Sequence, residues 1–459
     1  MGRPSEWENG KNTLKEPVDR VSAKSNNSTS IAIRQVLVED LDRGIPGLED
    51  FQHCLVVFRF KGAVVGTAWF PVVNGEVSPI RLQSVVSEIA WPVWQQIIAQ
   101  MEASPPPRIT TATVVVCTRN RASDLASGLP ALAKLVEQGH QVLVVDNCPS
   151  DDSTSQLVAK YPGIIYIYEP RAGLDIARNR GLREATGEVA VFIDDDAVPD
   201  AGWLDALLLD FDDPMVAVVT GITLPLELDT QAQSWFEKTN GFARGFTRRV
   251  FDSAMMSVVG TGQVGAGVNM AIRCSALGEI GLFDEALDGG TMTLSGGDQE
   301  FYYRTLARGY RIVYEPKALV WHKHRREWEA LRHTIFGYGV GLYAWWTKTL
   351  IVQKELTLLY WGTVWFCQHI LGNLMRSLLR RSGCVPLDLA WAELWGAVIG
   401  PFRYLRSSRA LNRQIRQSPA VGGLTKDWGQ APPDVTITNS NSPAGEVPIS
   451  GIQGRVEVQ

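Results

Sequence analysis

The sequence Val-Ala-Val-Phe-Ile-Asp-Asp-Asp occupies residues 189–196 and joins an apolar run to three consecutive carboxylates. A short run of β-branched and aromatic residues is typical of a strand buried on both faces of a parallel sheet. Ionised carboxylates side by side repel one another, so a compensating group is needed at the end of this strand. A divalent cation with an anionic ligand meets that need, because Mg²⁺ and Mn²⁺ prefer oxygen ligands and often recruit phosphates. A solvated acidic turn is the alternative, and the surrounding sequence decides between the two.

Strands and helices alternate on both sides of this stretch. The expected strands are Thr111–Cys117, Gln141–Val145, Ile164–Tyr168, Val189–Ile193 and Val216–Ile222, with a further one within Gly265–Arg273. The expected helices between them are Ala122–Gln138, Asp151–Lys160, Ile176–Ala185 and Trp203–Asp210. Strands separated by about ten to fifteen helical residues imply βαβ units and a mostly parallel sheet. The fold class is therefore α/β, and ligands are expected at the carboxyl ends of the strands.

Polar side chains follow the first two of these strands as well. Thr118 and Arg119 lie in a basic turn that opens a helix, where free backbone N–H groups favour nucleotide oxygens. Asp146 ends the second strand, where a carboxylate accepts hydrogen bonds from ribose hydroxyls or a base N–H; a helix cap or an Asx-turn is its alternative role. No Gly-x-Gly-x-x-Gly turn follows the first strand, and the sequence has no P-loop motif. We therefore expect a nucleotide site built from carboxylates and a metal ion.

Five segments of this region carry a family resemblance. They are Val114–Asn120, Val144–Asn147, Gly173–Asn179, Phe192–Asp196 and Gly297–Phe301, the last continuing through Arg304 and Gly309–Ile312 to Val320–His322. In this order they resemble family 2 glycosyltransferases of the GT-A fold, of a bacterial type with an extra N-terminal domain. The resemblance implies a nucleotide-diphosphate sugar donor, a sugar or lipid-linked acceptor, and Mn²⁺ or Mg²⁺ as cofactor.

The resemblance also assigns roles in the donor site. Asp146 would contact the nucleotide base, with Thr118 beside it, and Arg178 would support the donor. Asp194 and Asp196 correspond to the DxD pair of the family. Asp196 would hold the metal ion on the donor diphosphate, and Asp194 would lie near the sugar or the ribose.

Two neighbours of the DxD pair complete the expected donor site. Asp195 belongs to the same group, and we expect it to face solvent or to support its neighbours. His322 matches a histidine that joins the metal shell in some relatives; without the resemblance, the basic residues after it would favour a solvated cluster. The glycines at positions 260, 262, 265 and 267 predict a close backbone approach or a mobile loop near the substrate.

The catalytic base of inverting members of the family corresponds to Asp298. An inverting transfer needs a carboxylate to accept the proton of the acceptor hydroxyl as it attacks the anomeric carbon. The sequence Gly-Gly-Asp-Gln-Glu at residues 296–300 departs from the commoner Gly-Glu-Asp pattern, so Glu300 stays open as the base. Asp298 is also suited to cap a helix over Gln299–Ala307, and the two roles are compatible.

The composition divides the chain into five parts. Residues 1–30 are polar and predict disorder, residues 31–103 a small α+β domain, residues 108–326 the catalytic domain, residues 327–416 a helical region rich in Trp and Arg, and residues 417–459 a disordered tail. The α+β domain is expected to contain strands at Ile31–Val38, Cys54–Phe60 and Ala63–Phe70, a hairpin at Lys61-Gly62 and a helix over Leu82–Ile98. The stiff linker Ser104–Pro107 marks the boundary to the catalytic domain.

The region 336–416 predicts contact with a membrane. Its apolar stretches Leu356–Met375 and Leu387–Leu405 contain polar residues and are followed by arginines. Tryptophan-rich helices flanked by arginine suit the headgroup level of a bilayer, so we expect peripheral attachment. Packing into a protein core and a true transmembrane span are the alternatives.

Composition limits the remaining function classes. A formal net charge of −5 argues against a general nucleic-acid binder, and six scattered cysteines without a CxxC pair favour a reducing compartment. We therefore expect an inverting, metal-dependent glycosyltransferase of cell-surface polysaccharide or glycolipid synthesis, cytoplasmic and at the inner face of the plasma membrane. A sugar-nucleotide pyrophosphorylase and a catalytically silent carbohydrate- or lipid-binding scaffold are the alternatives.

Overall fold

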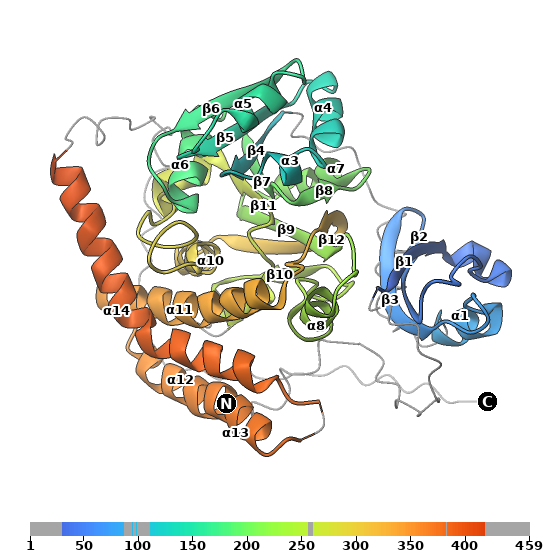
Figure 1. Cartoon of the computed structure of the whole chain (residues 1–459). Helices are drawn as coiled ribbons and strands as arrows, with labels where there is room; N and C mark the ends of the chain where they lie inside the picture. Colours follow the sequence, from blue (N-terminus) through green and yellow to red (C-terminus); the bar gives the residue numbers. More distant parts are fainter. Residues whose placement is uncertain are drawn as a thin grey trace, which may run out of the picture.

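A computed structural model describes residues 30–86, 94, 98, 111–255, 260–381 and 383–417 (Figure 1). The predicted linker at Ser104–Pro107, the predicted tail at 418–459 and nearly all of the predicted disordered segment at 1–30 lie outside these residues. The described part consists of a small unit with a three-stranded sheet, a larger unit built on a nine-stranded sheet, and a set of C-terminal helices.

The large sheet is parallel in one half and mixed in the other. Its order is β10-β12-β9-β11-β7-β4-β5-β6, with β8 paired to β12. The strands are β4 Ala112–Thr118, β5 Gln141–Asn147, β6 Ile164–Glu169, β7 Val189–Asp194, β8 Ala197–Pro199, β9 Val216–Pro225, β10 Arg249–Phe251, β11 Asn269–Arg273 and β12 Arg311–His322. The strands β7, β4, β5 and β6 run parallel, and β9 is parallel to β12. Only β11 separates the two parallel groups, and it is antiparallel to both of its neighbours.

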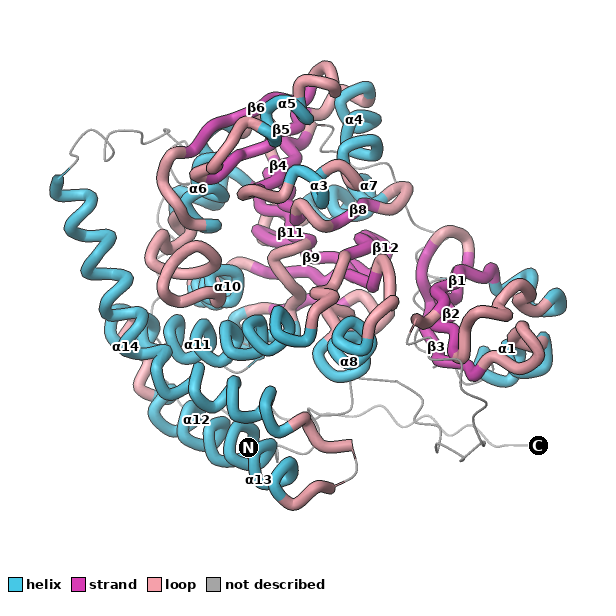
Figure 2. The backbone as a smooth tube through the Cα atoms, in the orientation of Figure 1, coloured by secondary structure: helices cyan, strands magenta, loops and turns pink. Residues whose placement is uncertain are grey.

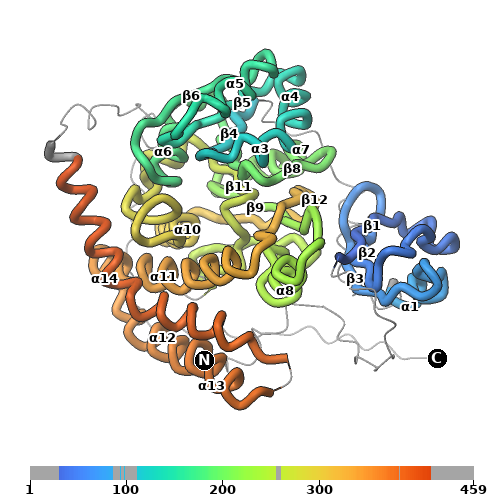
Figure 3. Tube along the Cα trace, viewed as in Figure 1, coloured from blue at the N-terminus to red at the C-terminus, as the bar shows by residue number. Residues whose placement is uncertain are grey.

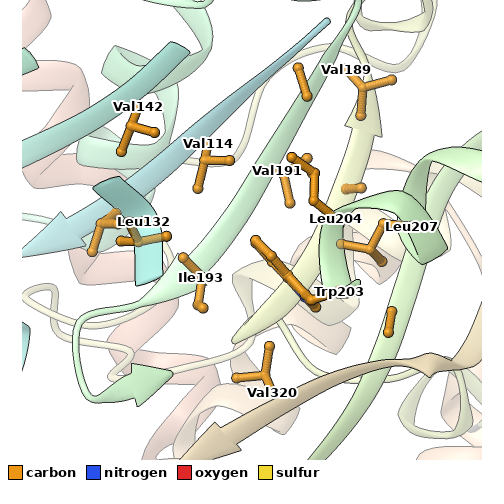
Figure 4. Packing of buried hydrophobic residues seen from close by; sticks show 14 of the residues in the cluster. Val114, Leu132, Val142, Val189, Val191, Ile193, Trp203, Leu204, Leu207 and Val320 are labelled. Carbon is orange, nitrogen blue, oxygen red and sulfur yellow. The ribbon is translucent and has the colours of Figure 1, made fainter. Parts of the chain in front are cut away.

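Alternating side chains of the strands feed two hydrophobic cores, one on each face of the sheet. In β4, Val114 and Val116 point into one core, where Trp203 and Leu207 of α7 (Trp203–Leu209) pack against them (Figure 4). Val115 points into the other core. The helices that cover this second face are α6 Leu174–Glu184, α9 Leu277–Ile280 and α10 Gly297–Ala307. Helices on both faces explain why the strands consist of continuous apolar runs.

Most expected elements of this unit are present, with one helix divided in two. Instead of one helix over Ala122–Gln138, the chain forms α3 Ala122–Leu125 and α4 Leu129–Glu137. The break falls at Gly128, where a Cβ atom would lie 2.7 Å from the carbonyl oxygen of Ala197. Tertiary contact with β8 therefore overrides the continuous apolar pattern. Within the predicted strand Gly265–Arg273, only β11 is extended. The remaining helices are α5 Ser153–Val158 and α8 Gln231–Asn240, the second of which was not predicted.

The N-terminal unit packs against the mixed half of the large sheet (Figure 2). It contains β1 Ala32–Leu37, β2 His53–Phe60, β3 Ala63–Pro71 and α1 Pro79–Val86. The predicted hairpin at Lys61-Gly62 joins β2 and β3, whereas most of the predicted helix Leu82–Ile98 lies outside the described residues. Val57 and Val64 share a core with Ile222 and Trp321, and Arg59 forms an ion pair with Asp200 at 2.8 Å. The small unit thus supports β12 and the connection after β8.

The C-terminal region is helical, as predicted (Figure 3). It consists of α11 Trp328–Val352, α12 Thr357–Trp365, a π-helical turn Phe366–Leu371, α13 Gly372–Leu378 and α14 Leu387–Gln417. Two glycines let α11 and α14 cross closely: a Cβ on Gly339 would lie 2.4 Å from the carbonyl oxygen of Glu393, and one on Gly396 would lie 2.3 Å from that of Phe336. Among the helices of the described residues, none is long and apolar enough to cross a bilayer.

The same two helices hold the segment that precedes α10. Arg403 of α14 donates a hydrogen bond to the carbonyl oxygen of Met292 at 3.1 Å, and Ser407 donates one to that of Ala286 at 2.8 Å. Ser295 donates to the carbonyl oxygen of Gly337 in α11 at 2.9 Å. The start of α10 is therefore held in place by the C-terminal helices.

Candidate functional site

The carboxyl ends of three neighbouring strands bring polar side chains together. Thr118 of β4 is paired in register with Asp146 of β5, and Cys117 with Asp194 of β7. The parallel register means that all three polar residues lie at the same edge of the sheet. This is the edge at which open α/β sheets bind ligands.

Asp194, Asp196 and His322 form a cluster at this edge. One ligand atom from each lies within 4.8 Å of the other two. The chain turns after β7 so that β8 pairs with the end of β12, which brings His322 opposite Ala197. Nε2 of His322 lies 3.1 Å from Oδ1 of Asp196. Residues more than a hundred positions apart in the sequence therefore meet in one cluster.

The donor set of this cluster fits a divalent cation such as Mn²⁺. Two carboxylates and an imidazole are ligands that such ions accept. Oδ1 of Asp196 is buried and receives no hydrogen bond, although it faces the histidine nitrogen. An acceptor left in this way costs free energy unless a cation or a proton compensates it.

Burial and charge shift the pKa values of the three groups in different directions. Burial raises the pKa of Asp194, and the neighbouring Asp196 raises it further. Burial acts against ionisation of Asp196 as well, but His322 and Arg121 hold its pKa well below the usual range. For His322, burial alone would lower the pKa, but the contact with Asp196 raises it. The alternative of a solvated basic cluster does not hold for the two histidines, because His322 and His324 are buried.

Arg121 clamps the acidic turn, a role that the sequence patterns did not reveal. Its guanidinium contacts Asp195 at 2.6 Å and Asp196 at 2.5 Å. Asp195 also accepts a hydrogen bond from the hydroxyl of Thr118 at 2.7 Å. Burial raises the pKa of Asp195 to about 7. Asp195 is 4% exposed, so the expectation that it faces solvent is wrong, whereas its contacts fit the expected supporting role.

Asp146 is fully buried, and only one of its two carboxylate oxygens accepts a hydrogen bond. Its Oδ2 accepts a hydrogen bond from the hydroxyl of Tyr166 at 3.0 Å, and its Oδ1 has no hydrogen-bond partner. Burial raises its pKa. The adjacent Asn147 makes the turn contacts instead: its side chain accepts from Gly173 N–H and donates to the carbonyl oxygen of Arg171. Asp146 itself lies in β5 and caps no helix.

Arg178 lies at the centre of a buried acidic group. Its guanidinium is 2.9 Å from Asp175 and 2.8 Å from Asp288, and it lies over the ring of Phe283. Burial works against the charge of Arg178, but Asp288 and Asp175 raise its pKa, with smaller contributions from Asp194 and Asp298. Arg178 therefore connects the metal-type cluster electrostatically with Asp298. Asp175 and Asp288 were not singled out from the sequence.

Asp298 lies in the first turn of α10, next to the backbone of Gly267. Its Oδ2 accepts the N–H of Gly267 at 2.9 Å, and its Oδ1 accepts that of Gln299 at 2.7 Å. The helix begins two residues earlier than expected and its N-cap is Gly296, so the predicted capping role of Asp298 is wrong. Burial raises the pKa of Asp298, and Asp288 adds to the effect.

Gly267 confirms one of the predicted close approaches of the backbone. A Cβ at this position would lie 2.8 Å from a guanidinium nitrogen of Arg178 and 3.1 Å from Cβ of Asp298. Only glycine lets the backbone N–H reach the carboxylate here. Gly265 is similar, since its φ is +139° and a Cβ would lie 2.5 Å from the hydroxyl of Thr220.

Glu300 and Arg119 lie apart from this arrangement. Glu300 is fully buried, with both carboxylate oxygens held by Arg304 and with Lys348 at 2.8 Å. Arg119 is exposed, and its guanidinium lies near Gly290 in the segment before α10. The structure thus brings together Asp194, Asp196 and His322, and leaves Arg119 at the rim.

Comparison with known proteins finds a family match over part of the chain. Residues 113–281 match the family model for Glycosyl transferase family 2. A pre-mycofactocin glycosyltransferase of Mycobacterium tuberculosis is 31% identical over 281 residues, which are 58% of this chain and 55% of that protein. The chain thus spans about half the length of this relative. Glycosyltransferase AglE of Haloferax volcanii is 24% identical over 59% of this chain and 86% of that protein.

A solved structure of low similarity completes the comparison. The mannosyltransferase PcManGT from Pyrobaculum calidifontis, in complex with GDP-Man and Mn²⁺, is 16% identical with a TM-score of 0.38 over 76% of this chain and 92% of that one. Similarity this low supports no transfer of ligands. The family match over residues 113–281, the mixed sheet and the acidic strand ends agree with one another, and this part of the chain is similar to glycosyltransferase family 2.

Proposed function

We propose that this chain is an inverting, metal-dependent glycosyltransferase that moves a sugar from a nucleotide-diphosphate donor to an acceptor hydroxyl. The observation that carries the proposal is the arrangement of two acidic groups around Arg178. Asp194, which belongs to the cluster with Asp196 and His322, and Asp298 both raise the pKa of Arg178. A carboxylate base and a metal-diphosphate site are the two components that such a transfer needs.

The donor would lie along the strand ends. Asp196 and His322 would hold Mn²⁺ or Mg²⁺, which when bound offsets the charge of the departing diphosphate. The buried Oδ1 of Asp146 has no hydrogen-bond partner within the protein, and it would accept a hydrogen bond from the nucleobase of the donor. Thr118 and Arg121 keep Asp195 in place, so that the acidic turn stays in one conformation. Arg119, exposed at the rim, would approach the donor from outside.

Asp298 is better suited than Glu300 to act as the base. Both of its oxygens accept backbone N–H groups, which fixes the side chain beside Gly267 without neutralising it. Its raised pKa makes it a better proton acceptor than an exposed aspartate. Glu300 has both oxygens engaged with buried cations and no free edge for a hydroxyl.

The surface of the C-terminal helices supports the proposed membrane contact. Leu387, Trp391, Trp395, Val398 and Phe402 form a stripe at helical spacing along α14, and each is more than 40% exposed. The stripe continues to α13 across an apolar groove of about 590 Å³, which Leu374, Leu378, Leu387, Asp388 and Trp391 line. Exposed arginines flank it at positions 376, 380, 381, 406, 409 and 413. We propose that this face binds the anionic inner surface of the plasma membrane.

A membrane contact narrows the range of possible acceptor molecules. A lipid-linked sugar or a surface-polysaccharide precursor would be presented at the same surface as the enzyme. The proposal therefore assigns the chain to cell-surface polysaccharide or glycolipid synthesis.

The D298N variant tests the reaction. The amide keeps the size of the side chain but cannot accept the proton, so transfer should fall by about 10²–10⁴-fold while Mn²⁺-dependent nucleotide binding persists. A panel of uridine and guanosine diphosphate sugars, screened for Mn²⁺-dependent thermal stabilisation and slow hydrolysis, first identifies the donor. D205N, an exposed carboxylate on α7, is the control and should behave as wild type. Normal turnover of D298N would refute the assignment of the base.

A further inference from the structure

A chain of hydrogen-bonding side chains extends behind His322, on the side away from the acidic turn. Nδ1 of His322 lies 3.3 Å from Nδ1 of His324, and Nε2 of His324 lies 2.9 Å from a carboxylate oxygen of Glu237. Both histidines are buried, and Glu237 is contributed by α8. The order of contacts is therefore Glu237, His324, His322 and Asp196.

Aromatic packing fixes the orientation of both imidazole rings. Phe242 packs edge-on against His322, with ring centroids 5.2 Å apart. Phe236 packs against His324 with centroids 4.8 Å apart. The capping box of α8, in which Thr230 and Gln233 satisfy each other's backbone groups, fixes the start of the helix that carries Glu237. The positions of both imidazole rings therefore depend on α8, which carries Phe236 and Glu237.

The chemistry of these groups determines where the protons lie. An ionised carboxylate only accepts hydrogen bonds, so Nε2 of His324 must carry a proton toward Glu237. With its proton on Nε2, the neutral ring of His324 presents Nδ1 as an acceptor. The facing Nδ1 of His322 must then carry a proton. In its neutral form, His322 directs the lone pair of Nε2 toward Asp196.

We infer that Glu237 and His324 are positioning residues that fix His322 in the tautomer that binds a metal ion through Nε2. With this tautomer, two acceptors, Nε2 of His322 and Oδ1 of Asp196, face each other at 3.1 Å. That arrangement is repulsive unless a cation lies at the cluster, and Oδ1 indeed has no hydrogen-bond partner. The inference rests on the proposed metal site and names side chains that no sequence motif indicated. Partners of this kind are known to orient metal-bound histidines.

Titration of the full chain with Mn²⁺ alone, followed by the electron paramagnetic resonance signal of the free ion, tests this role. In E237A the imidazole of His324 is released, and we expect Mn²⁺ to bind about 10–100-fold more weakly. E237Q retains an acceptor oxygen and should restore most of the affinity. E329Q changes a carboxylate in an exposed ion pair with Arg332 and should bind as wild type. Equal affinity of E237A and wild type would overturn the inference, provided that the circular dichroism of the variant is native.

A measurement on the unmodified protein does not depend on the folding of any variant. The chain has six histidines, few enough to resolve in ¹⁵N-histidine-labelled protein. In the presence of saturating Mg²⁺, which is diamagnetic, His322 should show a protonated Nδ1 and an unprotonated Nε2. A proton on Nε2 in that state would overturn the inference.

The two tests separate this inference from the proposed function. If wild-type protein binds no divalent cation, the metal site and the positioning role fail together. If wild type binds Mn²⁺ and E237A binds it equally well, only the positioning role fails, and the proposed transferase stands.

Discussion

The edge of the sheet that carries Asp146 and Asp194 differs from the C-terminal helices in which side chains are buried and which are exposed. At the edge of the sheet, charged groups are buried: Asp146, Asp175 and Asp196 are each less than 5% exposed. On α14, large apolar groups are exposed: Trp391, Trp395 and Phe402 are each more than half exposed. Both placements are unfavourable for a chain alone in water. These placements support the two proposed contacts, with an ionic ligand in the first region and with an apolar surface in the second.

The largest effect should follow removal of the metal ion from the acidic edge. Dialysis against EDTA should lower transfer by about 10³-fold or more, because the leaving diphosphate loses the cation that stabilises it. Added Mn²⁺ should restore the rate, as measured by release of nucleoside diphosphate. D124N removes a carboxylate that pairs with Arg121 and Lys323 but belongs to no ligand set, and it should keep the response to Mn²⁺. An EDTA-treated enzyme with undiminished transfer would contradict the proposed metal site.

The next effect separates a buried charge that stabilises the fold from one that serves the reaction. E300Q leaves Arg304 and Lys348 without their buried carboxylate, so the free energy of unfolding should fall by about 3–5 kcal/mol. Denaturation in urea measures the change. E329Q, in an exposed pair with Arg332, should show no measurable change. Full stability of E300Q with loss of transfer would instead assign the base to Glu300.

A smaller effect should follow changes on the apolar stripe. W391S combined with W395S should weaken binding to vesicles of phosphatidylcholine and phosphatidylglycerol by about tenfold or more, because two aromatic anchors are lost. Stability should be retained, since both side chains are exposed. I80S removes an even more exposed apolar side chain from the N-terminal unit and serves as the control. Vesicle binding that is unchanged in the double variant would exclude this face as the membrane contact. Added salt should weaken vesicle binding, because it screens the attraction between the arginines and the anionic lipid.

The smallest effect concerns the pH dependence of transfer. Asp298 must be deprotonated to act as the base, and its raised pKa moves the loss of activity on acidification to higher pH than for an ordinary aspartate. Asp288 contributes to this shift, so D288N should move the acid limb of kcat/KM back toward lower pH. A pH profile of both proteins measures the difference. An acid limb that D288N moves upward would contradict this account.

Sequence patterns located the strand ends but not the contacts between distant segments. The apolar runs before Asp146 and Asp194 predicted buried strands, and the parallel register placed both residues at one edge. Arg121 was missed because its contacts with Asp195 and Asp196 depend on how two loops meet in space. Glu237 was missed for the same reason, since its helix carries no sequence signal that relates it to His324.

The C-terminal helices show a similar limit. Their composition predicted helices with an apolar face, and α14 has that face. The composition did not reveal that Gly339 and Gly396 let two backbones cross, because both residues are poor helix formers and their value lies in the contact. For Asp298, the pattern predicted a helix cap, but the N-cap is Gly296, which packs closely on α11: a Cβ there would lie 2.7 Å from the carbonyl oxygen of Gly341.

The close crossing of α11 and α14 at Gly339 and Gly396 limits which substitutions this chain can accept. The segment before Asp298 is bonded to α14 through Arg403 and Ser407, and α14 rests on α11 through Gly396. A larger side chain at the crossing would push α14 outward and displace the segment that leads to the base. On the proposed membrane contact, the outer stripe is free to exchange one apolar residue for another, whereas the glycines at the crossing are not free to change. On these proposals, two faces of one helix are under different constraints, one set by the membrane contact and the other by the position of the base.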